Sequence, residues 1–170
     1  MAIPDGGLMI RVARAADEAA LTRVEAAAWT PASGFPSVIE RVSDPFFTFF
    51  TDDRPPGEHL VAEADGRVLG YIRVRPVTRL RENAHVLGIA GLAVDPLARR
   101  RGVATALLAA AERLTHERGG RKLSLRVLST NEPALRLYER SGFRREGTLR
   151  AEFCIEGLPV DDIVMAKQLG

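Results

Sequence analysis

The chain has 170 residues, of which 46% are hydrophobic and 27% are charged, and its formal net charge is +2. This composition is typical of a globular protein, and we predict a single domain over residues 1–170 with no membrane partner, because the longest apolar run covers only residues 86–94. The basic residues are spread along the chain apart from the run 99–101, the single cysteine cannot form an internal disulfide, and the three histidines form no cluster, so we expect no nucleic-acid partner and no metal site.

The N-terminal residues 1–10 lack the basic and apolar regions of a secretory signal, which favours a cytoplasmic location. Residues 9–14 are typical of a short strand. Asp17 can cap a helix that runs to about residue 29. The residues at helical spacing in this segment are Leu21, Val24, Glu25 and Ala28.

Residues 31–57 show no sustained period, and we expect this segment to be irregular and to cover a binding site. A short helix is predicted around residues 38–42. Phenylalanines follow at positions 46, 47, 49 and 50, and they either line an acceptor pocket or pack as core or lid residues.

The middle of the chain predicts strands. Residues 59–64 and 67–75 are joined by Asp65-Gly66, a dipeptide suited to a tight hairpin turn, so we expect an antiparallel pair. After a loop over residues 76–84, the run 86–94 is apolar on both faces, as expected of a buried central strand.

Residues 102–118 form the strongest predicted helix, and Gly119-Gly120 ends it. Residues 122–127 alternate polar and apolar side chains and therefore predict the next strand. A strand, a helix and a strand in this order indicate a right-handed crossover and a parallel strand pair.

The C-terminal part begins with a second helix, which Asn131 can cap and which runs to residue 140. Two strands are predicted after it, over residues 143–155 and 161–168. The turn between them is placed at residues 156–159.

An anion site is predicted where the strongest helix begins. The first amides of a helix have no intrahelical partner and lie at its positive end, so they can hold a diphosphate. Gly102 and Ala104 are small enough for a close approach, and Arg99, Arg100 and Arg101 add positive charge. The segment matches neither the P-loop nor the three-glycine dinucleotide pattern. A solvated basic loop before an ordinary helix is the alternative interpretation.

Two blocks of sequence resemble the GCN5-related N-acetyltransferase family. The first block is similar to the family's acetyl-coenzyme A motif, and it consists of Leu92-Ala93-Val94-Asp95-Pro96, Arg99-x-x-Gly102-x-Ala104 and Leu107-Leu108. The second block is similar to the family's second conserved segment, and it consists of Val127, Asn131, Ala134, Leu137-Tyr138-Glu139 and Ser141-Gly142-Phe143.

The resemblance implies an α/β fold with a mixed, mostly antiparallel central sheet, flanking helices and a splayed parallel strand pair that opens a cleft for acetyl-coenzyme A. By the same resemblance, Asn131 contacts the cofactor arm and Tyr138 lies near the thioester sulfur. The residues implied in cofactor binding are Leu92, Ala93, Val94, Arg99, Arg100, Arg101, Gly102, Val103, Ala104, Thr105, Asn131, Ala134 and Tyr138.

The implied activity is direct transfer of an acetyl group to an amine, with Tyr138 as the general acid. Many relatives place a glutamate on or near the fourth strand, but residues 88–94 contain no ionisable side chain. Glu82 and His85, just upstream, are the candidate general bases, and the alternative is that both are solvated loop residues.

The acceptor is expected to be a small-molecule primary amine, such as an amino acid, a polyamine or an amino sugar. A protein N-terminus or lysine is an alternative acceptor, and a non-catalytic acyl-coenzyme A sensor is an alternative function. Relatives are often dimers, so a homodimer is possible.

Overall fold

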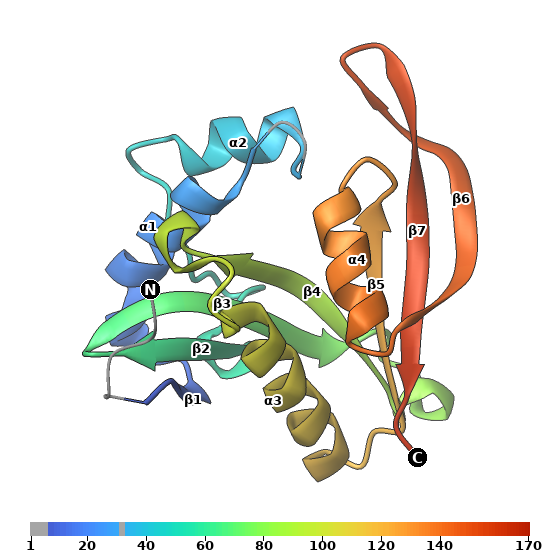
Figure 1. The fold of residues 1–170 in the computed structure, drawn as a ribbon, viewed down its shortest axis with the longest axis horizontal. Helices are drawn as coiled ribbons and strands as arrows, with labels where there is room; N and C mark the ends of the chain where they lie inside the picture. The colour runs from blue at the N-terminus through green and yellow to red at the C-terminus, as the bar shows by residue number, and fades with distance from the viewer. Residues whose placement is uncertain (1–6, 31–32) are drawn as a thin grey trace.

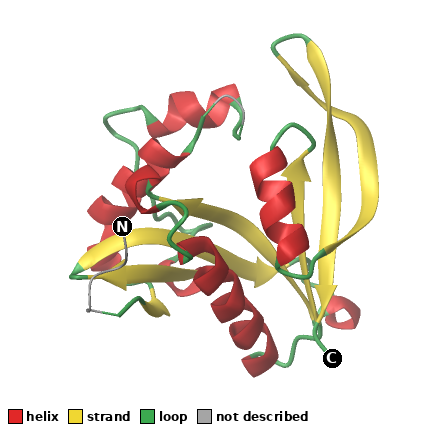
Figure 2. Cartoon of the chain, viewed as in Figure 1, coloured by secondary structure: helices red, strands yellow, loops and turns green. Residues whose placement is uncertain are grey.

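The computed structural model describes residues 7–30 and 33–170. Residues 1–6 and 31–32 lie outside the described residues. The first group is part of the N-terminal segment without a secretory signal pattern, and the second is part of the segment predicted to be irregular. The described chain forms one seven-stranded sheet with helices on both faces (Figures 1 and 2). Its main elements are β1 (Met9–Val12), α1 (Glu18–Ala28), α2 (Pro36–Val42), β2 (His59–Ala64), β3 (Arg67–Pro76), β4 (Val86–Val94), α3 (Val103–Glu117), β5 (Lys122–Leu128), α4 (Glu132–Arg140), β6 (Arg144–Ile155) and β7 (Leu158–Gln168).

The sheet has the strand order β1-β2-β3-β4-β5-β7-β6, and each neighbouring pair is antiparallel except β4 and β5. The parallel pair is short, because only residues 86–89 of β4 face residues 122–125 of β5. Beyond these residues the two strands diverge, as Figure 1 shows. The expected mixed sheet with one splayed parallel pair is confirmed.

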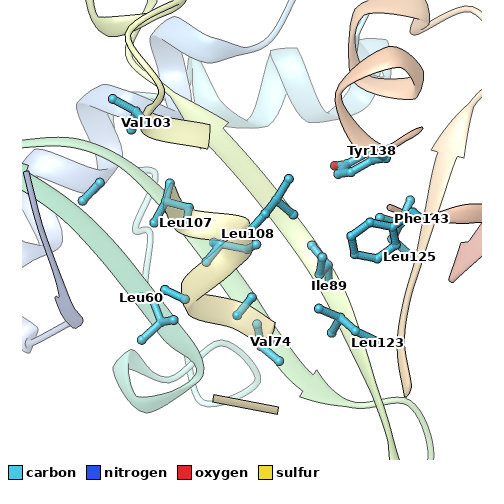
Figure 3. Close-up of a cluster of buried hydrophobic side chains, with 14 of the residues drawn as sticks. Leu60, Val74, Ile89, Val103, Leu107, Leu108, Leu123, Leu125, Tyr138 and Phe143 are labelled. Atoms are coloured by element: carbon cyan, nitrogen blue, oxygen red, sulfur yellow. The ribbon is translucent and has the colours of Figure 1, made fainter. Parts of the chain in front are cut away.

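Each face of the sheet has its own core. Helices α3 and α4 cover one face, where Leu107, Leu108 and Ala111 belong to a cluster with strand residues that include Ile72 and Leu123. Figure 3 shows Leu107, Leu108 and Leu123 of this cluster. On the other face, α1 packs Leu21 and Val24 against a cluster that contains Phe49 and Tyr71. Burying one such leucine stabilises the fold by about 1.5–3 kcal/mol.

The turns follow the local chemistry of the sequence, with one difference. Asp65 and Gly66 have φ values of 51° and 71°, as the predicted hairpin turn requires. The turn between β6 and β7 is shorter than predicted, because Glu156 and Gly157 alone, at φ values of 51° and 80°, reverse the chain. Leu158 and Pro159, which were predicted as turn residues, already belong to β7 and pair with β6.

Asp17 precedes α1 as predicted, but its side chain makes no capping hydrogen bond to that helix. Its carboxylate instead accepts hydrogen bonds from the Arg11 guanidinium at 2.8 Å and from the Arg14 backbone N–H at 2.7 Å. The hydrogen bond from Arg11 lowers the pKa of Asp17 below its ordinary value. Asp17 therefore occupies the predicted cap position, but the predicted capping hydrogen bond is wrong, because its carboxylate binds Arg11 of β1 and the Arg14 N–H instead.

Candidate active site

A cleft of about 910 Å³ lies where β4 and β5 diverge. Its walls come from both strands, from the C-terminal end of α1, from α4 and from the segment that precedes α3. The volume is within the range of small-molecule and cofactor sites. Of the predicted cofactor-binding residues, those in the lining are Leu92, Ala93, Val94, Arg99, Ala104, Asn131, Ala134 and Tyr138.

The start of α3 has the backbone form of an anion site. Gly102, the residue before the helix, has a φ of 79°, in the left-handed region that favours glycine. The first helical hydrogen bond runs from the Ala106 N–H to the Gly102 carbonyl at 2.9 Å, so the amides of residues 103–105 have no partner within the helix. The side chain of Val103 is buried in the core, and it therefore fixes this helix start to the sheet.

The arginines before α3 differ in what they contact. Arg99 donates a hydrogen bond from Nη2 to the carbonyl oxygen of Ala28 at 2.8 Å, so it joins the segment before α3 to the end of α1. Arg100 is exposed and has a φ of 60°. Arg100, Arg101, Gly102, Val103 and Thr105 are outside the set of residues that lines the cleft.

Helix α4 places two predicted residues toward the cleft. The side-chain oxygen of Asn131 accepts a hydrogen bond from the Ala134 N–H at 3.3 Å, which confirms the predicted helix cap. Tyr138 is buried, its ring packs at 5.8 Å from Phe143, and its hydroxyl points away from Phe143, toward the side of β4 (Figure 3). Burial raises the pKa of Tyr138 to about 12, so the hydroxyl remains protonated at neutral pH and can donate a proton.

A β-bulge interrupts β4 in the wall of the cleft. Arg73 of β3 faces Gly91 and Val74 faces Ile89, which leaves Ala90 without a partner on β3. Bulges bend a strand and change the direction of its side chains, and they are common next to active sites. The bend occurs where the pairing of β4 with β5 ends, so it helps to separate the two strands.

The two predicted bases, Glu82 and His85, lie away from the bulge of β4 and from the lining of the cleft. Glu82 lies in a short 3-10 helix, Arg81–Asn83, and is exposed. His85 precedes the paired end of β4, and neither side chain belongs to the set that lines the cleft. A strand advances about 3.3 Å per residue, so His85 is roughly 16 Å along β4 from the bulge.

A second cavity of about 620 Å³ adjoins the first on the α1 side of the sheet. The residues that line both cavities are Trp29, Phe35, Ala90 and Gly91. Phe47 and Phe49 of the phenylalanine cluster also line the second cavity, whereas Phe46 is 90% exposed. Phe49 is fully buried in the α1 core, so the cluster divides between core, cavity wall and surface.

The second cavity contains a charged side chain that the sequence prediction did not use. Glu25 of α1 is only 2% exposed, and it accepts hydrogen bonds from the Tyr71 hydroxyl and from Nη1 of Arg54, the latter at 3.1 Å. Arg54 also donates to the Tyr71 oxygen at 2.9 Å. The available signal was a carboxylate within the apolar stripe of a helix, a position where charges are rare unless they are paired.

Guanidinium groups dominate the charge of the main cleft. Arg75 is exposed, lines the cleft and makes no ion pair with any described residue. Arg126 also lines the cleft, where it pairs with Asp162 and with Glu152. Arg75 therefore remains available to an anionic group of a ligand.

No helix in the described chain is long and apolar enough to span a membrane. Within residues 7–30 and 33–170, no three His, Cys, Asp or Glu side chains are grouped to hold a metal ion.

The chain is similar to known acetyltransferases in sequence. Residues 16–143 match the model of the Acetyltransferase (GNAT) family. Over 116 residues the chain is 34% identical to the L-amino acid N-acetyltransferase AaaT of Escherichia coli (strain K12), and the match covers 68% of this chain and 70% of that protein. It is 41% identical over 85 residues to the mycothiol acetyltransferase of Clavibacter sepedonicus, a match that covers 50% of this chain and only 26% of that protein.

The fold is also similar to a solved structure of yncA from Salmonella typhimurium, a proposed acetyltransferase with its cofactor acetyl-CoA. The TM-score is 0.75, the sequence identity is 20%, and the match covers 96% of this chain and 95% of that chain. At this identity the likeness concerns the arrangement of helices and strands.

Proposed function

The chain belongs to the acetyltransferase (GNAT) family, and on this premise we propose that it transfers the acetyl group of acetyl-coenzyme A directly to the primary amine of a small molecule in a ternary complex. The observation that carries the proposal is the cleft between β4 and β5, with the open helix start of α3 beside it and Tyr138 in its lining. The acetyl-CoA in the structure of yncA, whose fold is similar, supports the choice of donor.

In this proposal the donor is held mainly by backbone groups. The amides of residues 103–105 bind the diphosphate, where the positive end of the α3 dipole favours an anion. Arg99, Arg100 and Arg101 add positive charge around it. The pantetheine arm pairs with residues 92–94, because β4 has no strand partner on its β5 side beyond Ile89 and its backbone groups there need partners.

The reaction is aminolysis of a thioester, which needs no covalent enzyme intermediate. Holding the amine and the thioester together can contribute about 7–11 kcal/mol to lowering the barrier. The departing thiolate requires a proton, and Tyr138 is placed to give it because its side chain lines the cleft and its phenol is protonated at neutral pH. A general acid of this kind contributes about 10²–10⁴ in rate.

The acceptor proposed is an amine that also carries a carboxylate, such as an L-amino acid. Arg75 supports this choice, because a guanidinium without an ion pair on the cleft wall attracts an anionic group. The name of the Escherichia coli relative, an L-amino acid N-acetyltransferase, points to the same class. A polyamine would need an acidic wall, but Asp162 is the carboxylate in the described lining of this cleft and it is paired with Arg126.

Thiol release from acetyl-coenzyme A tests the proposal when it is measured with L-leucine, spermidine, glucosamine and a short peptide in parallel. We expect turnover with L-leucine, with mass spectrometry showing a single added acetyl group on its nitrogen. Turnover only with spermidine or glucosamine would contradict the acceptor class. Binding of acetyl-coenzyme A without release of thiol to any amine would contradict the enzymatic function and support a sensor.

A further inference from the structure

We propose that Glu25 is the proton acceptor for the substrate amine and that the Tyr71 hydroxyl conducts the proton to it. This inference rests on the proposed acetyl transfer, since it supplies the base that β4 lacks. The two residues come from α1 and β3 and meet behind the bulge of β4, at the junction of the two cavities.

The position of Tyr71 brings the Glu25–Tyr71 pair next to the bulge of β4, where we expect the acetyl group to lie. A Cβ atom placed on Gly91 would lie 3.5 Å from the Tyr71 hydroxyl oxygen, so this phenol lies directly against the backbone of the bulge. Gly91 and the unpaired Ala90 line both cavities. If the pantetheine arm follows residues 92–94, the acetyl group comes to this point, and the amine of the acceptor meets it where the main cleft joins the second cavity, beside Tyr71.

The hydrogen bonds are arranged for a relay. The Tyr71 hydroxyl donates to Glu25 and accepts from Nη2 of Arg54 at 2.9 Å, so its oxygen retains one lone pair that can accept a further hydrogen bond. Burial, with the nearby Glu25 charge, raises the pKa of Tyr71 well above its ordinary value. The phenol therefore stays neutral and can pass a proton only by giving up its own at the same time.

Arg54 is held in place on its other sides. Its guanidinium carbon lies 3.9 Å from the Phe49 ring centroid, and its Nε donates to Nε2 of His59 at 3.4 Å. Nδ1 of His59 lies 2.9 Å from the Pro55 carbonyl and donates to it, which fixes the tautomer that accepts from Arg54. The ionisable groups that contact Glu25 or line its cavity are Arg41, Asp53, Arg54, Tyr71 and Arg73, and His59 lies behind Arg54.

The protons balance as follows. The first proton leaves the ammonium group for the Tyr71 oxygen while the Tyr71 proton moves to Glu25, which becomes a carboxylic acid. The nitrogen lone pair then forms the C–N bond, and the C–S bond breaks as Tyr138 protonates the sulfur. The second nitrogen proton, lost when the tetrahedral intermediate collapses, replaces the one that Tyr138 gave. Glu25 returns its proton to solvent through the second cavity.

The pH dependence of kcat/KM, measured with acetyl-coenzyme A and L-leucine, tests this assignment. If Glu25 accepts the proton, kcat/KM of the wild type reaches its plateau at a pH below the pKa of the free amine, because Glu25 deprotonates the bound ammonium. Glu25→Gln and Tyr71→Phe should each lower kcat/KM about 10²-fold at neutral pH. In both variants we expect the loss to shrink as the pH rises and the amine becomes neutral in solution. The double variant should be no slower than the slower single one, since both changes break one relay.

Asp17→Asn is the matched control, since Asp17 is another buried carboxylate paired with an arginine and lies away from both cavities. It should keep the wild-type profile. If Glu25→Gln fails to fold, Tyr71→Phe leaves the Glu25–Arg54 ion pair intact and decides the question alone. Variant profiles parallel to that of the wild type, with turnover intact, would overturn the relay and leave the acetyl transfer standing. A wild-type protein inactive toward every amine would instead overturn the proposed function.

Discussion

The two sides of the cleft are built in different ways. On the donor side, the groups proposed to bind acetyl-coenzyme A come from two short stretches, residues 92–105, which contribute mainly backbone amides and carbonyls, and residues 131–138, which contribute Asn131 and Tyr138. On the acceptor side, side chains from α1, β3 and the segment between α2 and β2 form one buried polar network. Glu25 and Tyr71 in this network are 46 positions apart in the chain. The donor side thus depends on local backbone geometry, and the acceptor side depends on tertiary packing.

The largest effect is expected from Gly102→Glu, which changes the backbone conformation and the charge at the start of α3, on the donor side of the cleft. At a φ of 79° a side chain is strained, and a carboxylate beside the proposed diphosphate site repels the ligand. We expect coenzyme A affinity to fall roughly 10³-fold in calorimetry. Gly119→Glu is the matched control, since Gly119 follows the opposite end of α3, has a φ of 75° and, like Gly102, has open space where a Cβ atom would lie. Equal losses in the two variants would refute the anion site.

Tyr138→Phe separates chemistry from binding on the donor side. The ring packing against Phe143 is kept, while the proton donor is removed. Turnover should fall about 10²-fold with nearly unchanged coenzyme A affinity. Steady-state kinetics and calorimetry on the same preparation measure the two effects. Full activity of Tyr138→Phe with the best amine would remove the assigned role from this residue.

The smallest effect concerns the acceptor side and the stability of its network. Burial lowers the pKa of His59 to about 4. Between about pH 6.5 and pH 4, His59 therefore binds a proton in the unfolded chain but stays neutral in the folded protein. The free energy of unfolding should therefore decrease as the pH falls from about 6.5 to about 4. His59→Gln should weaken this dependence and change the difference in Tm between pH 7 and pH 5 by a few degrees, at about 2–4 °C per kcal/mol.

The exposed His116, on the C-terminal turn of α3, provides the control for that experiment. His116→Gln should leave the dependence of Tm on pH as it is in the wild type. An unchanged acid response in His59→Gln would mean that other groups, such as the paired carboxylates, account for the loss of stability.

The same contrast explains what the sequence could predict. The apolar run of β4, the glycine before α3 and the asparagine before α4 are local signals, and each led to a correct element. Nearness to β4 in the sequence favours Glu82 and His85 as bases, but both precede Val86 and therefore lie near the end where β4 is paired with β5. Glu25, Arg54 and Tyr71 meet only after α1 packs on the sheet, and no local pattern describes that contact.

The hydrogen bond from Arg99 to the Ala28 carbonyl joins the two sides of the cleft. One end of this contact adjoins the proposed anchoring loop for the donor, and the other end adjoins Trp29, which lines both cavities. If loading of the thioester shifts this loop, the shift also reaches the wall that receives the amine. Reciprocity then requires that each ligand change the affinity for the other by the same factor, so the Kd of coenzyme A should differ between samples with and without the amine.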